Sequence, residues 1–182
     1  MFLQITSLLL DVIAGLLGGA CLLRLYMQYQ RIPFGNPVGR FVFALTDWIV
    51  LPLRKVLPGY KRWDFSSLLA AYLVELVQFT ILWLLMGRTS FGAYVPLLAL
   101  FGVVRLAISG AIGLVIIAAI LSWVRADSPI TDVIDRLAAP LLRPFRRIIP
   151  LVGGFDLSPL AALVALQVGA IVVAHLQNAV IR

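Results

Sequence analysis

The hydrophobic positions of this chain form four long runs, separated by stretches in which charged residues and prolines recur. The runs over 2–27, 66–86 and 158–178 each reach the roughly 20 residues that a helix needs to cross a hydrocarbon core about 30 Å thick. The run over 91–124 is longer than one crossing requires, and Arg105 interrupts it. We expect a short interfacial or partly inserted piece over 91–101 and a span over 102–124. A single tilted helix over the whole run is the alternative.

The stretches between the first and second spans and between the third and fourth spans have a different pattern. Over 129–149, charged residues fall on one side of a helix and apolar residues on the other. Such a segment is too charged to cross the bilayer. We predict two amphipathic helices, over 37–57 and 129–149, that lie in the headgroup plane with their apolar faces toward lipid. A solvent-exposed loop helix is the alternative.

Proline positions set the expected ends of these interfacial helices. Asn36 before Pro37 predicts a helix start, because asparagine caps a helix and proline suits the first helical position. Proline inside a helix removes a hydrogen bond, so we expect Pro52, Pro140 and Pro144 to bend or interrupt the helices, with breaks near Pro52 or Pro144. A short extra turn should follow each break, ending at Pro58 in the first stretch and at Pro150 in the second.

One motif occurs twice without a gap, which is the sign of a duplicated unit. We predict two tandem units, 1–86 and 87–182, each built as span, interfacial helix, span. The fold class is then an all-α membrane protein with four transmembrane helices and two interfacial helices. Both units begin and end on the same side, so the copies are parallel, unlike the inverted repeats of many secondary transporters. The aligned residues are Pro52, Pro58, Asp64 and Ser66 in the first unit and Pro144, Pro150, Asp156 and Ser158 in the second.

The repeated Asp and Ser have an expected structural role. Ser158 precedes Pro159 and predicts a side-chain cap at the start of the last span, while Asp156 suits the positive end of the helix dipole. We expect the Asp64 and Ser66 pair to start the second span in the same way.

Composition agrees with a membrane protein and changes the meaning of the charge. Of the 182 residues, 62% are hydrophobic and 13% are charged, where a soluble domain is nearer half and a quarter. The net charge of +7 would suggest a nucleic-acid partner for a soluble protein. Here basic loops beside membrane spans explain it, and no nucleic-acid partner is expected.

The positions of the basic residues predict the orientation. They gather in the two loops that hold the interfacial helices, and the positive-inside rule places both loops in the cytoplasm and both termini outside. We expect a multi-pass protein of a bacterial inner membrane whose first span is retained and not cleaved as a signal. Arg24, near the end of that span, is expected to snorkel toward the interface.

No catalytic, metal or cofactor site is expected. Cys21 is the only cysteine, so neither an internal disulfide nor a cysteine-based metal site is possible within the chain. His175 is the only histidine, and it is interpreted as an ordinary residue near a helix end, with an axial haem ligand as the alternative.

The repeated motif resembles that of the YggT (YlmG/CCB3) family of small membrane proteins. The resemblance covers nearly the whole chain as two tandem family units and is specific for the family. It implies no particular activity. Relatives have been connected with haem attachment to cytochrome b6 in plastids, with nucleoid or division-related organisation and with osmotic tolerance in bacteria. The residues that carry the resemblance are Asn36-Pro37, Pro52-x-Arg54-Lys55-x-x-Pro58 and Asp64-x-Ser66, repeated as Ser128-Pro129, Pro144-x-Arg146-Arg147-x-x-Pro150 and Asp156-x-Ser158-Pro159.

Three ionisable residues, Asp11, Glu75 and Arg105, lie within predicted spans. A charge at the middle of a bilayer costs about 2.5–3.5 kcal/mol on insertion scales, so such residues pair or line a wet cavity. We expect Arg105 to form an internal ion pair with Asp11 or Glu75. A proton or ion relay that includes Gln78 and Gln167 is the alternative.

The basic loop residues suit anionic lipid headgroups or an acidic partner protein, and the sequence does not separate the two. We predict a non-enzymatic membrane scaffold or assembly factor, with a membrane or cytoplasmic protein partner and with self-association left open. The alternative is a small channel or transport accessory linked to osmotic or ion homeostasis. The predicted lipid or partner surface consists of Arg54, Lys55, Arg143, Arg146 and Arg147.

Overall fold

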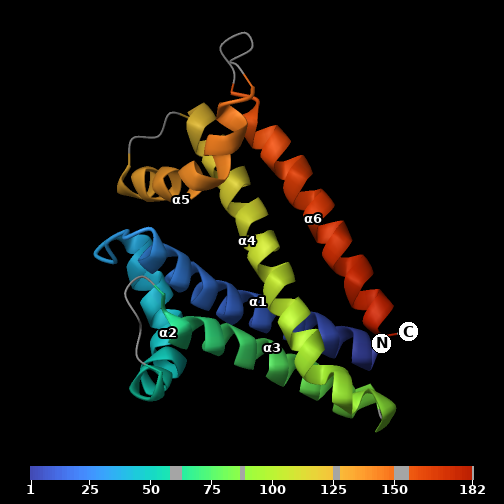
Figure 1. The fold of residues 1–182 in the computed structure, drawn as a ribbon. Helices are drawn as coiled ribbons and strands as arrows, with labels where there is room; N and C mark the ends of the chain where they lie inside the picture. Colours follow the sequence, from blue (N-terminus) through green and yellow to red (C-terminus); the bar gives the residue numbers. More distant parts are fainter. Residues whose placement is uncertain (58–62, 87–88, 125–127, 150–155, 182) are drawn as a thin grey trace.

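A computed structural model describes residues 1–57, 63–86, 89–124, 128–149 and 156–181 of the protein (Figure 1). Over these ranges the chain forms α-helices and one short 3-10 helix, which confirms the all-α class. In chain order the elements are α1 Phe2–Tyr29, α2 Pro37–Val56, α3 Phe65–Met86, η1 Thr89–Tyr94, α4 Val95–Val124, α5 Pro129–Arg146 and α6 Ser158–Ile181.

Among the described residues, α1, α3, α4 and α6 are long and apolar enough to cross a membrane, as the hydrophobic runs predict. In Figure 1, α1 and α3 lie side by side and run in opposite directions. Helices α4 and α6 form a second antiparallel pair. The two pairs meet where α4 packs against α3 and α1. Gly18 permits this approach, because a Cβ there would lie 2.7 Å from Cδ2 of Leu106.

The third span differs from the expectation of a separate piece over 91–101. One helix, α4, runs for 30 residues from Val95 and follows the 3-10 helix η1 directly, so the expected piece over 91–101 is wrong. The run agrees with the alternative of a single helix from Val95 onward, and the tilt stays a prediction. Pro96 does not interrupt it, because the first helical turn needs no N–H donor from that position.

The shorter helices α2 and α5 lie across the ends of the two helix pairs, away from the N- and C-termini (Figure 1). Both starts follow the sequence expectation. Asn36 Oδ1 accepts a hydrogen bond from the N–H of Gly39 at 2.8 Å, and Ser128 Oγ accepts one from the N–H of Thr131 at 3.2 Å.

The expected breaks at the internal prolines are wrong. Helix α2 continues through Pro52 to Val56, and α5 continues through Pro144 to Arg146. Helix α5 also passes Pro140 without a break. All three prolines are exposed, so each ring removes one backbone hydrogen bond on an uncovered side of its helix, and the helix continues. Pro58 and Pro150 lie outside the described residues. In the second unit a turn does follow the helix, because the N–H groups of Ile148 and Ile149 donate to the backbone oxygen of Phe145 at 3.0 and 2.9 Å.

The apolar face of α5 is covered by protein and is not left free for lipid. The exposed side of α2, in contrast, carries Phe41, Trp48 and Leu51. The cross-helices, as we call α2 and α5, therefore differ in the side chains that they expose. The buried residues of α5 are Val133, Ile134, Leu137, Ala138 and Leu142.

The same positions form the core where each cross-helix meets its own pair. The repeat offset is 92 residues, the difference between Pro52 and Pro144, and it aligns Val50 with Leu142 and Ala70 with Ala162. All four side chains are buried. The two-unit organisation is thus visible in the packing, while the unit boundary at 86 and 87 stays a prediction.

A further apolar cluster joins the two units at the end where α2 and α5 lie. Leu137 of α5 is fully buried there, and its backbone oxygen accepts a hydrogen bond from Tyr26 Oη of α1 at 2.9 Å. The units are therefore in contact through side chains and not only through the chain connection. The cluster consists of Met27, Ile32, Val42, Val133 and Leu137.

Candidate functional site

Each unit ties the end of its cross-helix to the start of the next span by an arginine–aspartate pair. Arg54 of α2 pairs with Asp64, and Arg146 of α5 pairs with Asp156 at 2.9 Å. These residues align at the repeat offset, so the motif encodes the same arginine–aspartate contact twice. We call each of these two ion pairs a clamp. The arginines were predicted for a lipid or partner surface. That role stays a prediction, and the structure gives them a structural contact in addition.

The aspartates also begin the spans. Ser67 donates to Asp64 through its hydroxyl at 2.8 Å and its N–H at 3.3 Å, and the N–H of Ser158 donates to Asp156 Oδ1 at 2.9 Å. Ser158 is itself the first helical residue, so the aspartate and not the serine supplies this cap. Ser66 differs again, because its hydroxyl donates to the backbone oxygen of Leu57 at 2.5 Å.

The two clamps sit in different environments. Asp64 is fully buried, whereas the Asp156 side chain is 26% exposed. Burial of Asp156 raises its pKa, but hydrogen bonds from Ser158 and Arg146 outweigh burial and hold the pKa below its usual value. The carboxylate form of Asp156 is therefore the form that the clamp favours.

The first unit adds a second arginine to its clamp. Arg24 of α1 is buried, pairs with Asp47 at 2.7 Å, donates to Thr46 Oγ1 at 2.8 Å and lies 3.9 Å from Asp64. Its guanidinium carbon is 4.6 Å from the centre of the Phe43 ring. The expectation that Arg24 snorkels to the interface is wrong, because it pairs with Asp47 and lies beside the buried carboxylate of Asp64.

A comparison of the two units could have revealed this contact from sequence. At the repeat offset, Ile116 stands in place of Arg24 and Ala139 in place of Asp47. A cation and an anion absent together from one copy indicate that they are partners in the other.

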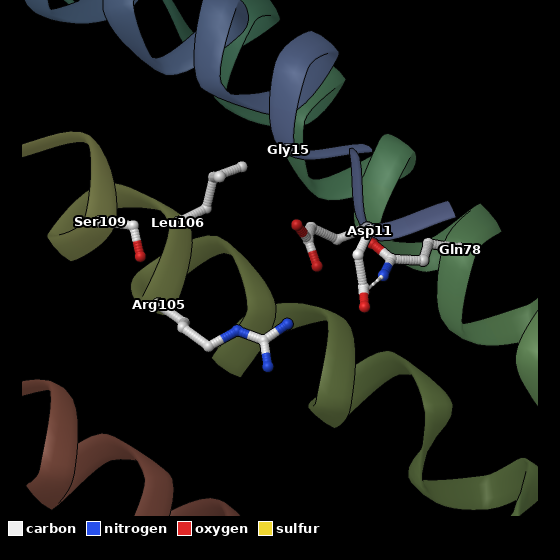
Figure 2. A pocket seen from close by; sticks show the side chains of 7 residues that line it. Asp11, Gly15, Gln78, Arg105, Leu106 and Ser109 are labelled. Carbon is white, nitrogen blue, oxygen red and sulfur yellow. Dashed lines mark hydrogen bonds between the residues drawn. The ribbon is translucent and has the colours of Figure 1, made fainter. Parts of the chain in front are cut away.

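A polar pocket lies between α1, α3 and α4, inside the predicted membrane region (Figure 2). It has a volume of about 270 Å³. Figure 2 shows Asp11 and Gln78 on one side of it and Arg105 on the other. The structure thus brings together the three intramembrane charges that the sequence singles out. The lining consists of Asp11, Gly15, Glu75, Gln78, Arg105, Leu106 and Ser109.

The expected ion pair within this pocket is not formed. The ion pairs of the described residues join Arg24, Arg54 and Arg146 to aspartates, and none includes Arg105. Asp11 instead accepts a hydrogen bond from the amide nitrogen of Gln78 at 2.5 Å. Separate helices hold Arg105 and the acids apart across the pocket, which the positions in the sequence do not specify.

The other predicted polar residues lie away from this pocket. Gln167 is exposed on α6 and is not part of the lining, so the structure does not place it with Gln78. His175 is exposed, and its Nδ1 lies 3.3 Å from the backbone oxygen of Ile171 on the same helix. Among the described residues, no three His, Cys, Asp or Glu side chains gather in a way that could hold a metal ion.

The basic residues fall into two groups. Arg54 and Arg146 are engaged in the clamps, whereas Lys55, Arg143 and Arg147 are exposed and belong to none of the ion pairs of the described residues. The latter three are therefore the predicted surface residues with the most freedom to meet another molecule.

Comparisons with known proteins agree with the repeat. The CCB3/YggT family model matches residues 3–85 and again residues 97–177. A protein of Escherichia coli strain K12 named "Uncharacterized protein YggT" is 36% identical over 168 residues, which cover 89% of this chain and 85% of that protein. An "Uncharacterized protein in proC 3'region" of Vibrio alginolyticus is 36% identical over 80% of both chains. No solved structure matches the chain.

Proposed function

The chain belongs to the CCB3/YggT family, and from that premise we propose that it is a non-enzymatic scaffold or assembly factor of the bacterial inner membrane. Its cytoplasmic surface would bind anionic lipid or a partner protein. The observation that carries the proposal is that α2 and α5 lie across the same end of the bundle, each fixed there by an arginine–aspartate clamp.

The exposed sides of α2 and α5 differ in chemistry, which supports a different contact for each helix. Phe41, Trp48 and Leu51 of α2 are exposed apolar side chains, which suit the acyl region just below the headgroups. The exposed side of α5 is charged and includes Arg143, with Arg147 just beyond the helix. On this proposal α2 rests in the inner leaflet, and α5 presents basic groups to headgroups or to an acidic partner.

The test neutralises the exposed basic residues and leaves the clamps intact. The variant carries Lys55→Gln, Arg143→Gln and Arg147→Gln. At about 1 kcal/mol for each basic residue near an anionic surface, it should bind its lipid or partner roughly a hundredfold more weakly. Cross-linking in native membranes with mass spectrometry measures the partner. The ratio of phosphatidylglycerol to phosphatidylcholine that co-purifies with the chain measures the lipid.

A matched control changes the net charge equally at the opposite end of the bundle. Gln4→Glu, Gln177→Glu and Asn178→Asp also lower the net charge by three units, by adding three carboxylates near the termini. The control should retain the partner and the lipid ratio of the unaltered protein. If the basic-surface variant recovers as much lipid and partner as the unaltered protein, the scaffold proposal is rejected.

The polar pocket favours a second candidate, a small channel or transport accessory. A cavity lined by ionisable groups within the spans is a feature of ion pathways. Ion flux into vesicles that contain the reconstituted protein tests this candidate. If no ion flux is measured under sodium, potassium or proton gradients, the transport candidate is rejected and the scaffold is the remaining proposal.

A further inference from the structure

The pocket between α1, α3 and α4 does not balance its own charge. Asp11 faces it from α1, Glu75 and Gln78 from α3, and Arg105 and Ser109 from α4. Two carboxylates thus share one guanidinium, and with all three groups charged the pocket holds one excess negative charge. Within a low-dielectric span such a charge is costly and needs a positive counterpart.

Glu75 is the side chain that most needs a partner. The residue is 3% exposed, lines the pocket and has an Oε2 atom that is buried without a hydrogen-bond partner. An unsatisfied buried carboxylate oxygen is rare in a folded protein and indicates an ion, a proton or another group at that place.

The backbone of α4 leaves space for the Glu75 carboxylate. A Cβ at Gly102 would lie 2.1 Å from Oε2 and 2.8 Å from Cδ of Glu75. Any larger residue at this position would force the carboxylate to move. The absence of a side chain at Gly102 therefore maintains the position of the carboxylate at the pocket.

Other oxygens are available around the same space. The amide nitrogen of Gln78 donates to Asp11, so the amide oxygen of Gln78 remains an acceptor. Ser109 adds a hydroxyl to the lining. The pocket also reaches the surface of the bundle, because Asp11, Arg105 and Ser109 are exposed.

We propose that this pocket binds one monovalent cation through the carboxylates of Asp11 and Glu75. Arg105 acts as a fixed positive charge opposite them, so that a single added charge makes the site neutral and a divalent ion is disfavoured. The cation is either a metal ion such as Na⁺, held by carboxylate and neutral oxygens, or a proton carried by Glu75. The proposal deepens the second candidate function by naming its ligand class, but binding does not require transport.

The test measures thermal unfolding of the purified full chain in detergent. Choline chloride is replaced by NaCl or KCl at constant ionic strength and pH 8, and pH is varied separately in choline chloride. Binding at ten times the dissociation constant should raise the unfolding midpoint by about 3–6 °C. A rise with metal ion at fixed pH identifies a metal ion, and a rise only on acidification identifies a proton.

Two variants connect the response to this pocket. Glu75→Gln removes the charge with little change in shape, and Gly102→Ala displaces the carboxylate without changing any charge. For a metal-ion site, both variants should lose the metal-ion response. For a proton site, Glu75→Gln should lose the rise of the unfolding midpoint on acidification that the unaltered protein shows. Gly110→Ala, on the same helix as Gly102, is the matched control, because a Cβ at Gly110 would have no neighbouring atom within 4 Å. It should respond like the unaltered protein.

The same experiments distinguish the site from the transport function. A response lost in Glu75→Gln without any vesicle flux retains the site and rejects transport. Responses to both metal ion and pH that are unchanged in Glu75→Gln would overturn the site, whatever the flux measurement gives.

Discussion

Replacing Asp64 by asparagine is expected to lower the free energy of unfolding by about 3–5 kcal/mol. The side chain is fully buried between Arg54 and Arg24, and its loss of charge leaves two guanidinium groups with one fewer carboxylate. Asparagine keeps the shape, and its amide oxygen can still accept the bond from the N–H of Ser67. Its NH2 group then replaces the oxygen that accepts from Arg54 and from the Ser67 hydroxyl, so the variant loses these bonds together with the charge. Unfolding in mixed micelles, followed by tryptophan fluorescence, measures the effect.

The repeat supplies the control for this variant. Asp156→Asn changes the equivalent residue, whose side chain is 26% exposed and whose partner Arg146 is 53% exposed. Water screens that pair, so we expect a loss of about 1 kcal/mol or less. Equal losses from the two variants would show that the buried network of the first unit adds nothing to the shared clamp.

Replacing Leu137 by alanine should cost about 2–5 kcal/mol, because it opens a cavity in the core cluster that joins the two units. Leu137 is fully buried there against residues of the first unit. The loss should appear first as looser packing of α5, which hydrogen exchange along Pro129–Arg146 reports.

Ile130→Ala is the control on the same helix, since Ile130 is 43% exposed. Its effect on unfolding should stay within about 0.5 kcal/mol. A loss from Leu137→Ala no larger than this would mean that the units are joined by their spans alone.

The sequence predicts those parts of the fold that depend on long or repeated patterns. Apolar runs identify the four spans because a bilayer requires about 20 apolar residues in succession. The helix starts at Asn36 and Ser128 follow from local capping chemistry, which needs no distant partner. The repeated Pro and Asp positions identify the two units, and the family comparison agrees.

What the sequence does not predict depends on distances between helices. Arg24 resembles any arginine near the end of a span until the structure places Asp47 beside it. Arg105 is expected to pair with an acid, but separate helices set the distance across the pocket. Pro52 and Pro144 are expected to break helices, but both lie on exposed sides of their helices, where the loss of one backbone hydrogen bond is tolerated.

The central claim is that both cross-helices lie on the cytoplasmic surface of one membrane. Single cysteines at positions 55, 147 and 178, in a chain that carries Cys21→Ala, test it with a membrane-impermeant thiol reagent on intact and opened cells. Lys55→Cys and Arg147→Cys should react only when the cytoplasmic side is open, and Asn178→Cys should react in intact cells. Reaction of positions 55 and 147 from opposite sides of the membrane would contradict the account.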